Sequence, residues 1–220
     1  MLKTPVLLSV AVGIFIGAAS LPTFAESSPR LQDAGLEQVL EAFRRRRSPW
    51  QGISRGDGQL CAVSPGVIGD ENMIWSDRPF FIWQGNARTI QVLDFSTQNL
   101  VWSSPITQAD QIAMVINLPL QQGAQYVWIL SDGKNSYESL FKIMPTEARD
   151  QLTKDLQKLE QDLQSNGATD EAIAVAQANY FSQKNLWSDA LQRLYSVENP
   201  SVEVVQAQQQ LMAELCRQGS

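Results

Sequence analysis

Short apolar runs separated by turn residues dominate the chain between Leu60 and Met144. Turn residues recur about every 8–12 positions, a spacing that is typical of all-β domains. No stretch between the runs is long enough for a helical crossover, so neighbouring strands are expected to be antiparallel. The pattern therefore predicts an antiparallel β-sandwich of about seven strands, at residues 60–64, 79–84, 88–94, 99–103, 111–116, 124–131 and 136–143.

The strand predicted at 124–131 is apolar on both of its faces. Tyr126, Trp128 and Leu130 alternate with Val127 and Ile129. A strand of this kind is expected in the middle of a sheet rather than at its edge. Leu120, Gly123 and Tyr126 also have the spacing of a tyrosine corner, in which the phenol crosses a loop and bonds the backbone upstream.

Helical periodicity appears on both sides of this region. Leu36, Val39, Leu40 and Phe43 repeat at i, i+3, i+4 and i+7, which predicts a short amphipathic helix. After Pro145, apolar residues return at helical spacing and short loops separate them, which predicts a bundle of about four helices. The predicted organisation is a signal peptide (1–25), an N-terminal helix and loop (26–54), a β-sandwich domain (55–144) and a helical domain (145–220).

The first residues have the pattern of a secretory signal peptide. Lys3 precedes an apolar stretch, and small residues lead to a cleavage site predicted after Ala25. The alternative is an uncleaved membrane anchor, but the apolar run falls short of the ~20 residues that a span needs. The prediction is therefore a secreted or periplasmic protein without a stable membrane span after cleavage.

The charge balance narrows the range of partners. The chain has 17 basic and 23 acidic residues, which gives a net charge of −6. Nucleic acid is therefore not expected as a partner, because phosphate binding needs a basic field. The chain's run of like charges is Arg44, Arg45, Arg46 and Arg47. It fits either contact with an anionic surface or ordinary complementation of a helix C-terminus.

The two cysteines, Cys61 and Cys216, have two interpretations. In an oxidising compartment they can form one disulfide that ties the first strand to the last helix. Alternatively, they are two buried thiols that behave as small apolar residues.

The residue inventory predicts a protein that is not an enzyme. The chain has no histidine, which removes Ser-His and Cys-His nucleophiles and most zinc sites. The chain also has neither a nucleotide-binding motif nor the ligand spacing of a calcium-binding EF-hand, so neither a cofactor nor a metal is expected. A candidate site remains in one loop, where Asp70, Glu71 and Asp77 lie near Trp75 in the sequence. Such carboxylates can serve glycoside hydrolysis, but in loops they are more often solvated or form turns.

Four tryptophans lie in or beside the predicted strands: Trp75, Trp83, Trp102 and Trp128. Their default role is packing between the two sheets, since each aromatic side chain buries roughly 150–250 Å². The alternative is a platform on which a carbohydrate stacks. Trp75 fits the core least well, because it lies beside Ser76, Asp77 and Arg78.

Parts of the chain resemble known families. The segments Pro79-Phe-Phe-Ile-Trp83 and Leu120-Gln-Gln-Gly-Ala-Gln-Tyr-Val-Trp128 resemble immunoglobulin and fibronectin type III domains. With Arg55-Gly-Asp57 and Cys61-Ala-Val-Ser-Pro65, the chain is similar to secreted cyanobacterial proteins of unknown function that pair such a sandwich with a helical tail. Ala178, Phe181, Ala190 and Leu194 also resemble one tetratricopeptide hairpin. None of these resemblances implies a catalytic residue.

The first functional hypothesis is a non-catalytic binding or adaptor protein of the cell envelope, with a protein partner at the sandwich edge or in a helical groove. It follows from two modules of interaction type without a catalytic constellation. The alternatives are a carbohydrate-binding module or weak glycoside-acting enzyme, with a glycan as partner, and a purely structural envelope component.

Overall fold

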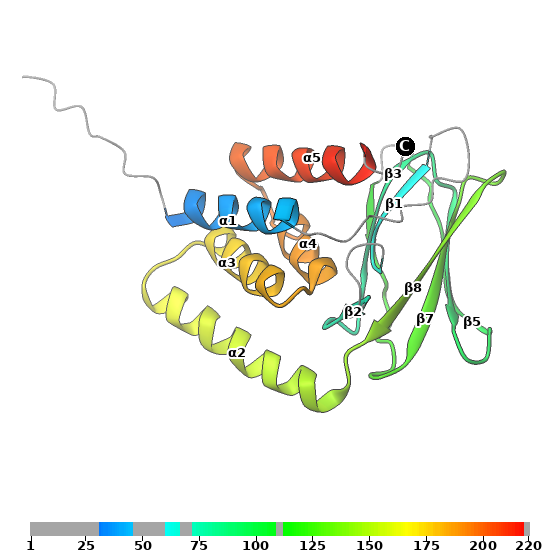
Figure 1. Ribbon diagram of the computed structural model, residues 1–220, viewed down its shortest axis with the longest axis horizontal. Helices are drawn as coiled ribbons and strands as arrows, with labels where there is room; N and C mark the ends of the chain where they lie inside the picture. The colour runs from blue at the N-terminus through cyan, green and yellow to red at the C-terminus, as the bar shows by residue number, and fades with distance from the viewer. Residues whose placement is uncertain (1–30, 46–59, 67–71, 109–111, 218–220) are drawn as a thin grey trace, which may run out of the picture.

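A computed structural model describes residues 31–45, 60–66, 72–108 and 112–217 of the 220-residue chain (Figure 1). The predictions for the signal peptide and for residues 46–59 lie outside this part of the chain. Within these residues, one helix precedes eight strands, and four helices follow them. The elements are α1 (Leu31–Arg45), β1 (Leu60–Ser64), β2 (Met73–Ile74), β3 (Phe80–Gly85), β4 (Thr89–Asp94), β5 (Leu100–Pro105), β6 (Ala113–Val115), β7 (Gln125–Ser131), β8 (Ser136–Ile143), α2 (Thr146–Ser165), α3 (Asp170–Gln183), α4 (Trp187–Tyr195) and α5 (Val202–Arg217).

The strands form two sheets that share one apolar core. A three-stranded sheet has the order β1-β3-β6, and a five-stranded sheet has the order β2-β8-β7-β4-β5. The core between them contains Phe81 and Trp83 from β3, and Trp128 and Leu130 from β7. As the alternation predicts, β7 lies inside its sheet, paired with β4 and β8.

The prediction of an entirely antiparallel arrangement of about seven strands is wrong at β2. This eighth strand is only two residues long and pairs with β8 in the parallel direction. Two residues cannot show a period in the sequence, so alternation could not predict the strand. Its place is set by tertiary contacts, among them the 2.8 Å hydrogen bond from Met144 N–H to the Ile74 carbonyl.

The helices form one body of five, because α1 joins the four that follow the strands; the predicted bundle of about four did not include it. The predicted amphipathic face of α1, with Leu36, Val39, Leu40 and Phe43, is buried. It packs on α3 and α5, and the Phe43 ring meets the Trp187 ring edge-on at 4.9 Å. The N-terminal helix therefore belongs to the same core as α3, α4 and α5.

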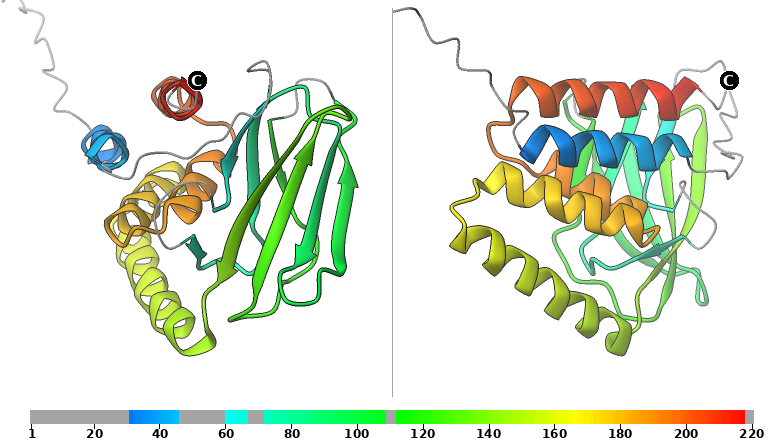
Figure 2. Two further views of the ribbon diagram at one scale, coloured as in Figure 1. Left: turned by 45° about the vertical axis from the view of Figure 1, so that its right-hand side comes forward. Right: turned by 60° about the vertical axis from the view of Figure 1, so that its left-hand side comes forward.

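The molecule is arranged as three layers (Figures 1 and 2). The helices cover the outer face of the three-stranded sheet, where Val63 and Ile82 join the helical core. The five-stranded sheet lies on the other side of the three-stranded one, so β5 is far from the helices (Figure 1). A disulfide between Cys61 and Cys216 joins β1 to α5, with the two Cα atoms 5.9 Å apart.

α2 is the least enclosed of the helices. It runs along the lower border of the helical layer (Figure 2). Leu156 is its buried residue, although Leu152, Leu159 and Leu163 share the same stripe. Within the described residues, no helix is both long and apolar enough to cross a membrane.

Candidate functional site

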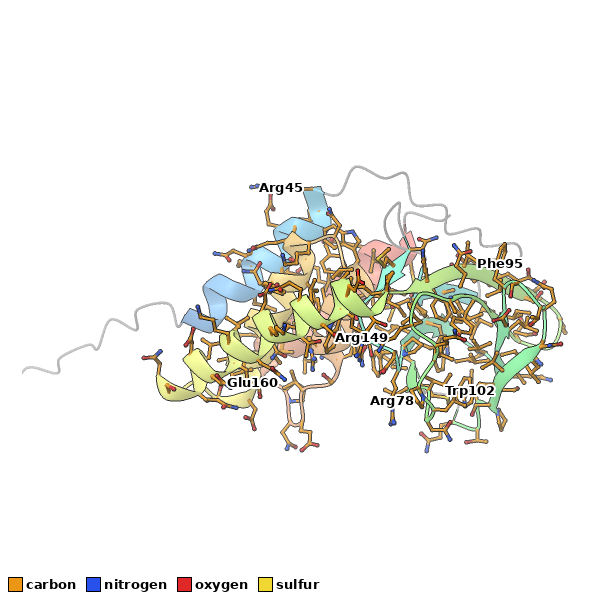
Figure 3. All side chains as sticks on the ribbon, turned by 90° about the horizontal axis from the view of Figure 1, so that it is seen from below. Arg45, Arg78, Phe95, Trp102, Arg149 and Glu160 are labelled. Atoms are coloured by element: carbon orange, nitrogen blue, oxygen red, sulfur yellow. A yellow bond between two sulfur atoms is a disulfide. The ribbon has the colours of Figure 1, made fainter. Side chains whose placement is uncertain are left out.

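The predicted site around Trp75 lies where the sheets meet the helices. Asp70 and Glu71 fall outside the described residues, whereas Trp75 and Asp77 closely follow β2. Helices α2, α3 and α4 approach this segment from the opposite side, and Figure 3 shows Arg149 of α2 at the boundary. The position of Trp75 therefore has to be explained by its contacts with these helices.

The indole ring of Trp75 is half-buried and is covered from several directions. Its centroid lies 5.5 Å from that of the Phe181 ring. The guanidinium carbons of Arg149 and Arg193 lie 5.4 Å and 5.6 Å from the indole. The indole N–H donates to the Thr153 hydroxyl at 3.2 Å. These contacts use both the edge and the faces of the ring to join the sheets to the helices.

Asp189 is the central charged group of this contact. It lies in the first turn of α4, and its side chain is buried, with 2% of its surface exposed. One carboxylate oxygen accepts a hydrogen bond from the backbone N–H of Trp75 at 2.8 Å, and the other accepts one from the backbone N–H of Ser76 at 2.9 Å. Burial raises the pKa of the Asp189 carboxyl to about 6, although both N–H donors and Arg193 act against this rise.

Arg149 completes the contact from α2. Its Nε donates to the Trp75 carbonyl at 3.1 Å, and its terminal nitrogen lies 3.2 Å from an Asp77 oxygen. We call the group formed by Trp75, Ser76, Asp77, Arg149, Asp189 and Arg193 the junction cluster. Its polar groups bond one another across the boundary, so its geometry holds β2 and the helices together.

The described part of the arginine run is paired with carboxylates. Arg45 Nε donates to Glu41 at 2.8 Å. Arg44 lies 3.7 Å from Glu41 and 3.8 Å from Glu214 of α5. These guanidinium groups lower the pKa of Glu41. Arg46 and Arg47 lie outside the described residues, so the predicted contact with an anionic surface stays a prediction.

The predicted tyrosine corner has its hydrogen bond. The Tyr126 hydroxyl accepts the Gln121 N–H at 3.0 Å, and its ring stacks on Phe141 with centroids 5.7 Å apart. Gly123 lies in the turn between Gln121 and Tyr126 at φ +78°, a backbone angle that a residue with a Cβ adopts only under strain. Leu120 is buried beside the corner. These residues fix the turn that leads into β7.

The five described tryptophans are divided between the core and two half-buried positions. Trp83 and Trp128 have no exposed surface, and 6% of Trp187 is exposed. Trp75 and Trp102 are half-buried. Trp102 of β5 stacks nearly parallel on Phe81 at 5.8 Å, and its N–H donates to the Asn117 side-chain oxygen at 3.0 Å. Trp102 therefore has one face engaged by the protein, whereas Trp75 is contacted from several directions.

Among the described residues, one border of the two sheets carries exposed apolar side chains and no charged side chain on its strands. β5 and β6 are each an edge strand of their sheet, and the Trp102–Asn117 bond links β5 to the segment after β6. Between Asp94 and Asp132, the sequence has one charged residue, Asp110. We call this border the uncharged edge; it comprises β5, β6 and the exposed side chains of Leu100, Ile112 and Val115. Figure 3 shows Trp102 of β5 far from the helices.

Sequence reasoning missed the two parts that the structure makes prominent. Asp189 looks like an ordinary acidic residue in a first helical turn, and nothing in the sequence marks it as buried. The sequence does signal the uncharged edge, because the stretch between Arg88 and Lys134 has no lysine, arginine or glutamate and crosses four strands. That signal shows which strands lack charge, but not which of them are outermost.

Other surface features offer less chemistry. A hollow of 530 Å³ lies between α1 and α3, lined by Glu37, Gln38, Glu41, Ala42, Arg45, Asn179 and Gln183. Asn179 already donates to Gln38 at 2.7 Å inside it. Within the described residues, no three His, Cys, Asp or Glu side chains gather in a group that could hold a metal ion. Comparison with protein-family models, curated proteins and solved structures finds no match to this chain.

Proposed function

We propose that this protein is a non-catalytic binding or adaptor protein of the cell envelope, and that a protein partner docks on the uncharged edge. The observation that carries the proposal is the combination of outermost strands, exposed apolar side chains and missing charge at this border. Leu100 is 56% exposed and Val115 is 46% exposed. The rest of the chain is rich in carboxylates.

Unprotected sheet edges tend to pair with other strands. An edge strand has unpaired N–H and C=O groups, and proteins usually discourage pairing there with lysine, other charges, proline or bulges. Here β5 has a bulge at Val101 and ends at Pro105, but it has no charged side chain. The centre of the strand is therefore open to a partner, and the flanking apolar side chains add area that a partner can cover.

The fold and the cysteines support an envelope protein with an immunoglobulin-like sandwich. The two facing sheets, the shared core and the tyrosine corner are all features of such domains. A disulfide is typical of proteins from oxidising compartments. The predicted signal peptide is consistent with the same location.

Site-specific photocrosslinking tests the proposal. A photoreactive phenylalanine analogue replaces Ser103, which is exposed on β5, in protein expressed in the source organism. Replacement of Val202, 67% exposed at the start of α5, is the matched control. We expect a discrete adduct of one mass from position 103 and none from position 202. Adducts of equal yield at both positions, or none at position 103, would refute the proposed docking surface.

A further inference from the structure

We infer that the partner at the uncharged edge is a second copy of this chain, paired β5 to β5 about a two-fold axis. This inference rests on the proposed function, since it names the occupant of the proposed docking surface. Three features of the edge support it: the backbone groups that are free, the register that they impose and the charges around them.

The pairing of β5 with β4 determines which backbone groups of β5 remain available for a second strand. The Ile106 N–H donates to the Arg88 carbonyl at 2.7 Å, and Ser104 and Trp102 lie opposite Ile90 and Val92. In an antiparallel ladder, the residues that bond a neighbouring strand alternate with residues that point away from it. Ser103 falls between them, so its N–H and C=O point toward the open side. Its side chain is small and exposed.

The two ends of β5 limit how a second strand can pair. The bulge displaces Val101 from the regular ladder, and Pro105 has no N–H to donate. The usable stretch is therefore centred on Ser103. With a two-fold axis perpendicular to the sheet, paired residues from the two copies point to the same face of the joined sheet. When the axis passes through the contact at Ser103, Ser103 of one copy lies opposite Ser103 of the other. Each Ser103 then donates its N–H to the other copy's carbonyl.

This register also pairs side chains of suitable size. Trp102 of one copy lies opposite Ser104 of the other, so the large indole meets a small residue. The bulge at Val101 turns the exposed Leu100 to the other face of the sheet, so this regular pairing is limited to Trp102, Ser103 and Ser104. The contact is self-complementary, as a two-fold interface requires.

Charge favours this face for contact between two copies. Each chain has a net charge of −6, so copies repel wherever their charged surfaces meet. The uncharged edge lets them approach without placing two carboxylates together. In the proposed register, the Asp94 end of β4 in one copy and the Arg88 end of β4 in the other lie toward the same end of the contact, with the two β5 strands between them, so the charges at each end have opposite signs.

The molar mass in solution tests the inference. We expect the purified protein to have twice the mass of one chain at high concentration, and the Ser103→Lys variant to have the mass of one chain, because two ammonium groups would meet on the axis. Val202→Lys adds the same charge on the helical side and should keep the dimer mass. Circular dichroism establishes that each variant is folded.

A thiol at the axis gives a second, independent measurement. Opposed residues in an antiparallel ladder have Cα atoms about 4.5–5.5 Å apart, within the range that a disulfide spans. Because Cys61 and Cys216 are paired with each other, Ser103→Cys adds the one free thiol to the described chain. We expect oxidation to give a covalent dimer from Ser103→Cys and much less from Val202→Cys.

The outcomes separate this inference from the proposed function. A single-chain mass at every concentration, with no more covalent dimer from Ser103→Cys than from Val202→Cys, overturns the pairing of two copies. If position 103 then still gives a photocrosslinked adduct with a different protein, the proposed function stands and the second copy is wrong. Absence of both dimer and adduct removes both proposals.

Discussion

The junction cluster and the uncharged edge differ in how they place charge. At the junction, Asp189 is buried and both of its oxygens accept backbone N–H groups. At the edge, apolar side chains are exposed and the strand β5 has no charged residue. The first surface is closed within the chain, whereas the second is left open.

Charge distinguishes a permanent contact from a surface that is free to associate. A buried charge is tolerated only where its hydrogen bonds are satisfied, so it fixes one geometry and suits a permanent contact. A surface without charge can be covered by another protein with little cost of desolvation. The junction therefore fits a role inside the molecule, and the edge fits association. Five measurements can test this contrast.

Removing the disulfide should have the largest effect on stability. The bond joins β1 to α5 across a sequence separation of 155 residues. In the chain-entropy model, such a loop lowers the entropy of the unfolded chain enough to stabilise the protein by about 4–5 kcal/mol. We expect Cys61→Ala with Cys216→Ala to lose most of this free energy of unfolding, measured by urea denaturation. A loss below about 1 kcal/mol would contradict the entropic argument.

Acidity should change stability through Asp189. Its folded pKa of about 6 lies above its ordinary value of 3.8, so between these values the folded chain binds more protons than the unfolded chain. The free energy of unfolding should therefore fall as the pH rises through this window, by up to about 3 kcal/mol from this group, and then level off.

The control for this pH dependence is Asp189→Asn, which should flatten the curve between about pH 4 and 6. The exposed carboxylates Asp94 and Asp132 have lowered pKa values, so they act with the opposite sign and at lower pH. A slope that persists unchanged in Asp189→Asn would show that another group binds the proton.

Truncating Asp189 should loosen the junction cluster. In Asp189→Ala, the Trp75 and Ser76 N–H groups lose their acceptor. Each unsatisfied N–H group destabilises the fold by on the order of 1–3 kcal/mol, but the variant also avoids the desolvation cost of a buried carboxylate. We expect a net loss of about 2 kcal/mol at pH 7, larger than that of Asp189→Asn, which keeps one acceptor. The comparison is made by chemical denaturation, and equal stabilities of the two variants would argue against the hydrogen-bonding role.

Removing the corner hydroxyl should have a smaller effect. Tyr126→Phe deletes the bond to the Gln121 N–H but keeps the ring on Phe141. One hydrogen bond of this kind contributes about 1 kcal/mol. Tyr126→Leu, which also removes the stacked ring, should lose clearly more. Thermal unfolding of the two variants separates the hydroxyl from the ring, and a negligible loss in Tyr126→Phe would reduce the corner to a packing feature.

The smallest effect on the folding of a single chain is expected at the edge. Ser103 is exposed and its side chain has no role in the core, so Ser103→Lys should change the free energy of unfolding of the monomer by less than about 0.5 kcal/mol. Its effect should appear in the molar mass instead. A strong destabilisation at dilute concentration would mean that β5 depends on Ser103 for its own pairing with β4.

Sequence reasoning locates most of the strands because the chain signals them locally. The predicted strand at 136–143 coincides with β8, and the one at 124–131 differs from β7 by one residue. Alternating apolar residues and the turn at Asp132-Gly133 set these boundaries without help from distant contacts. β2 escapes prediction because its two residues adopt a strand only by pairing with β8.

The candidate sites are less predictable than the strands. Local sequence suggests stacking or acid chemistry for Trp75 and Asp77, and the structure instead places them against Arg149, Arg193 and Asp189. These partners lie more than 70 positions away in the sequence. A local pattern of residues cannot contain that information.

Local order in the chain was enough to specify the amphipathic face of α1, the alternation in β7 and the corner at Tyr126, because each depends on residues within a few positions of one another. Contacts between distant elements were needed to make α1 complete the helical core, to bury Asp189 against the segment after β2 and to leave β5 and β6 as an open border. Burial and exposure at those places depend on which elements meet in three dimensions, and short-range patterns in the chain do not specify that.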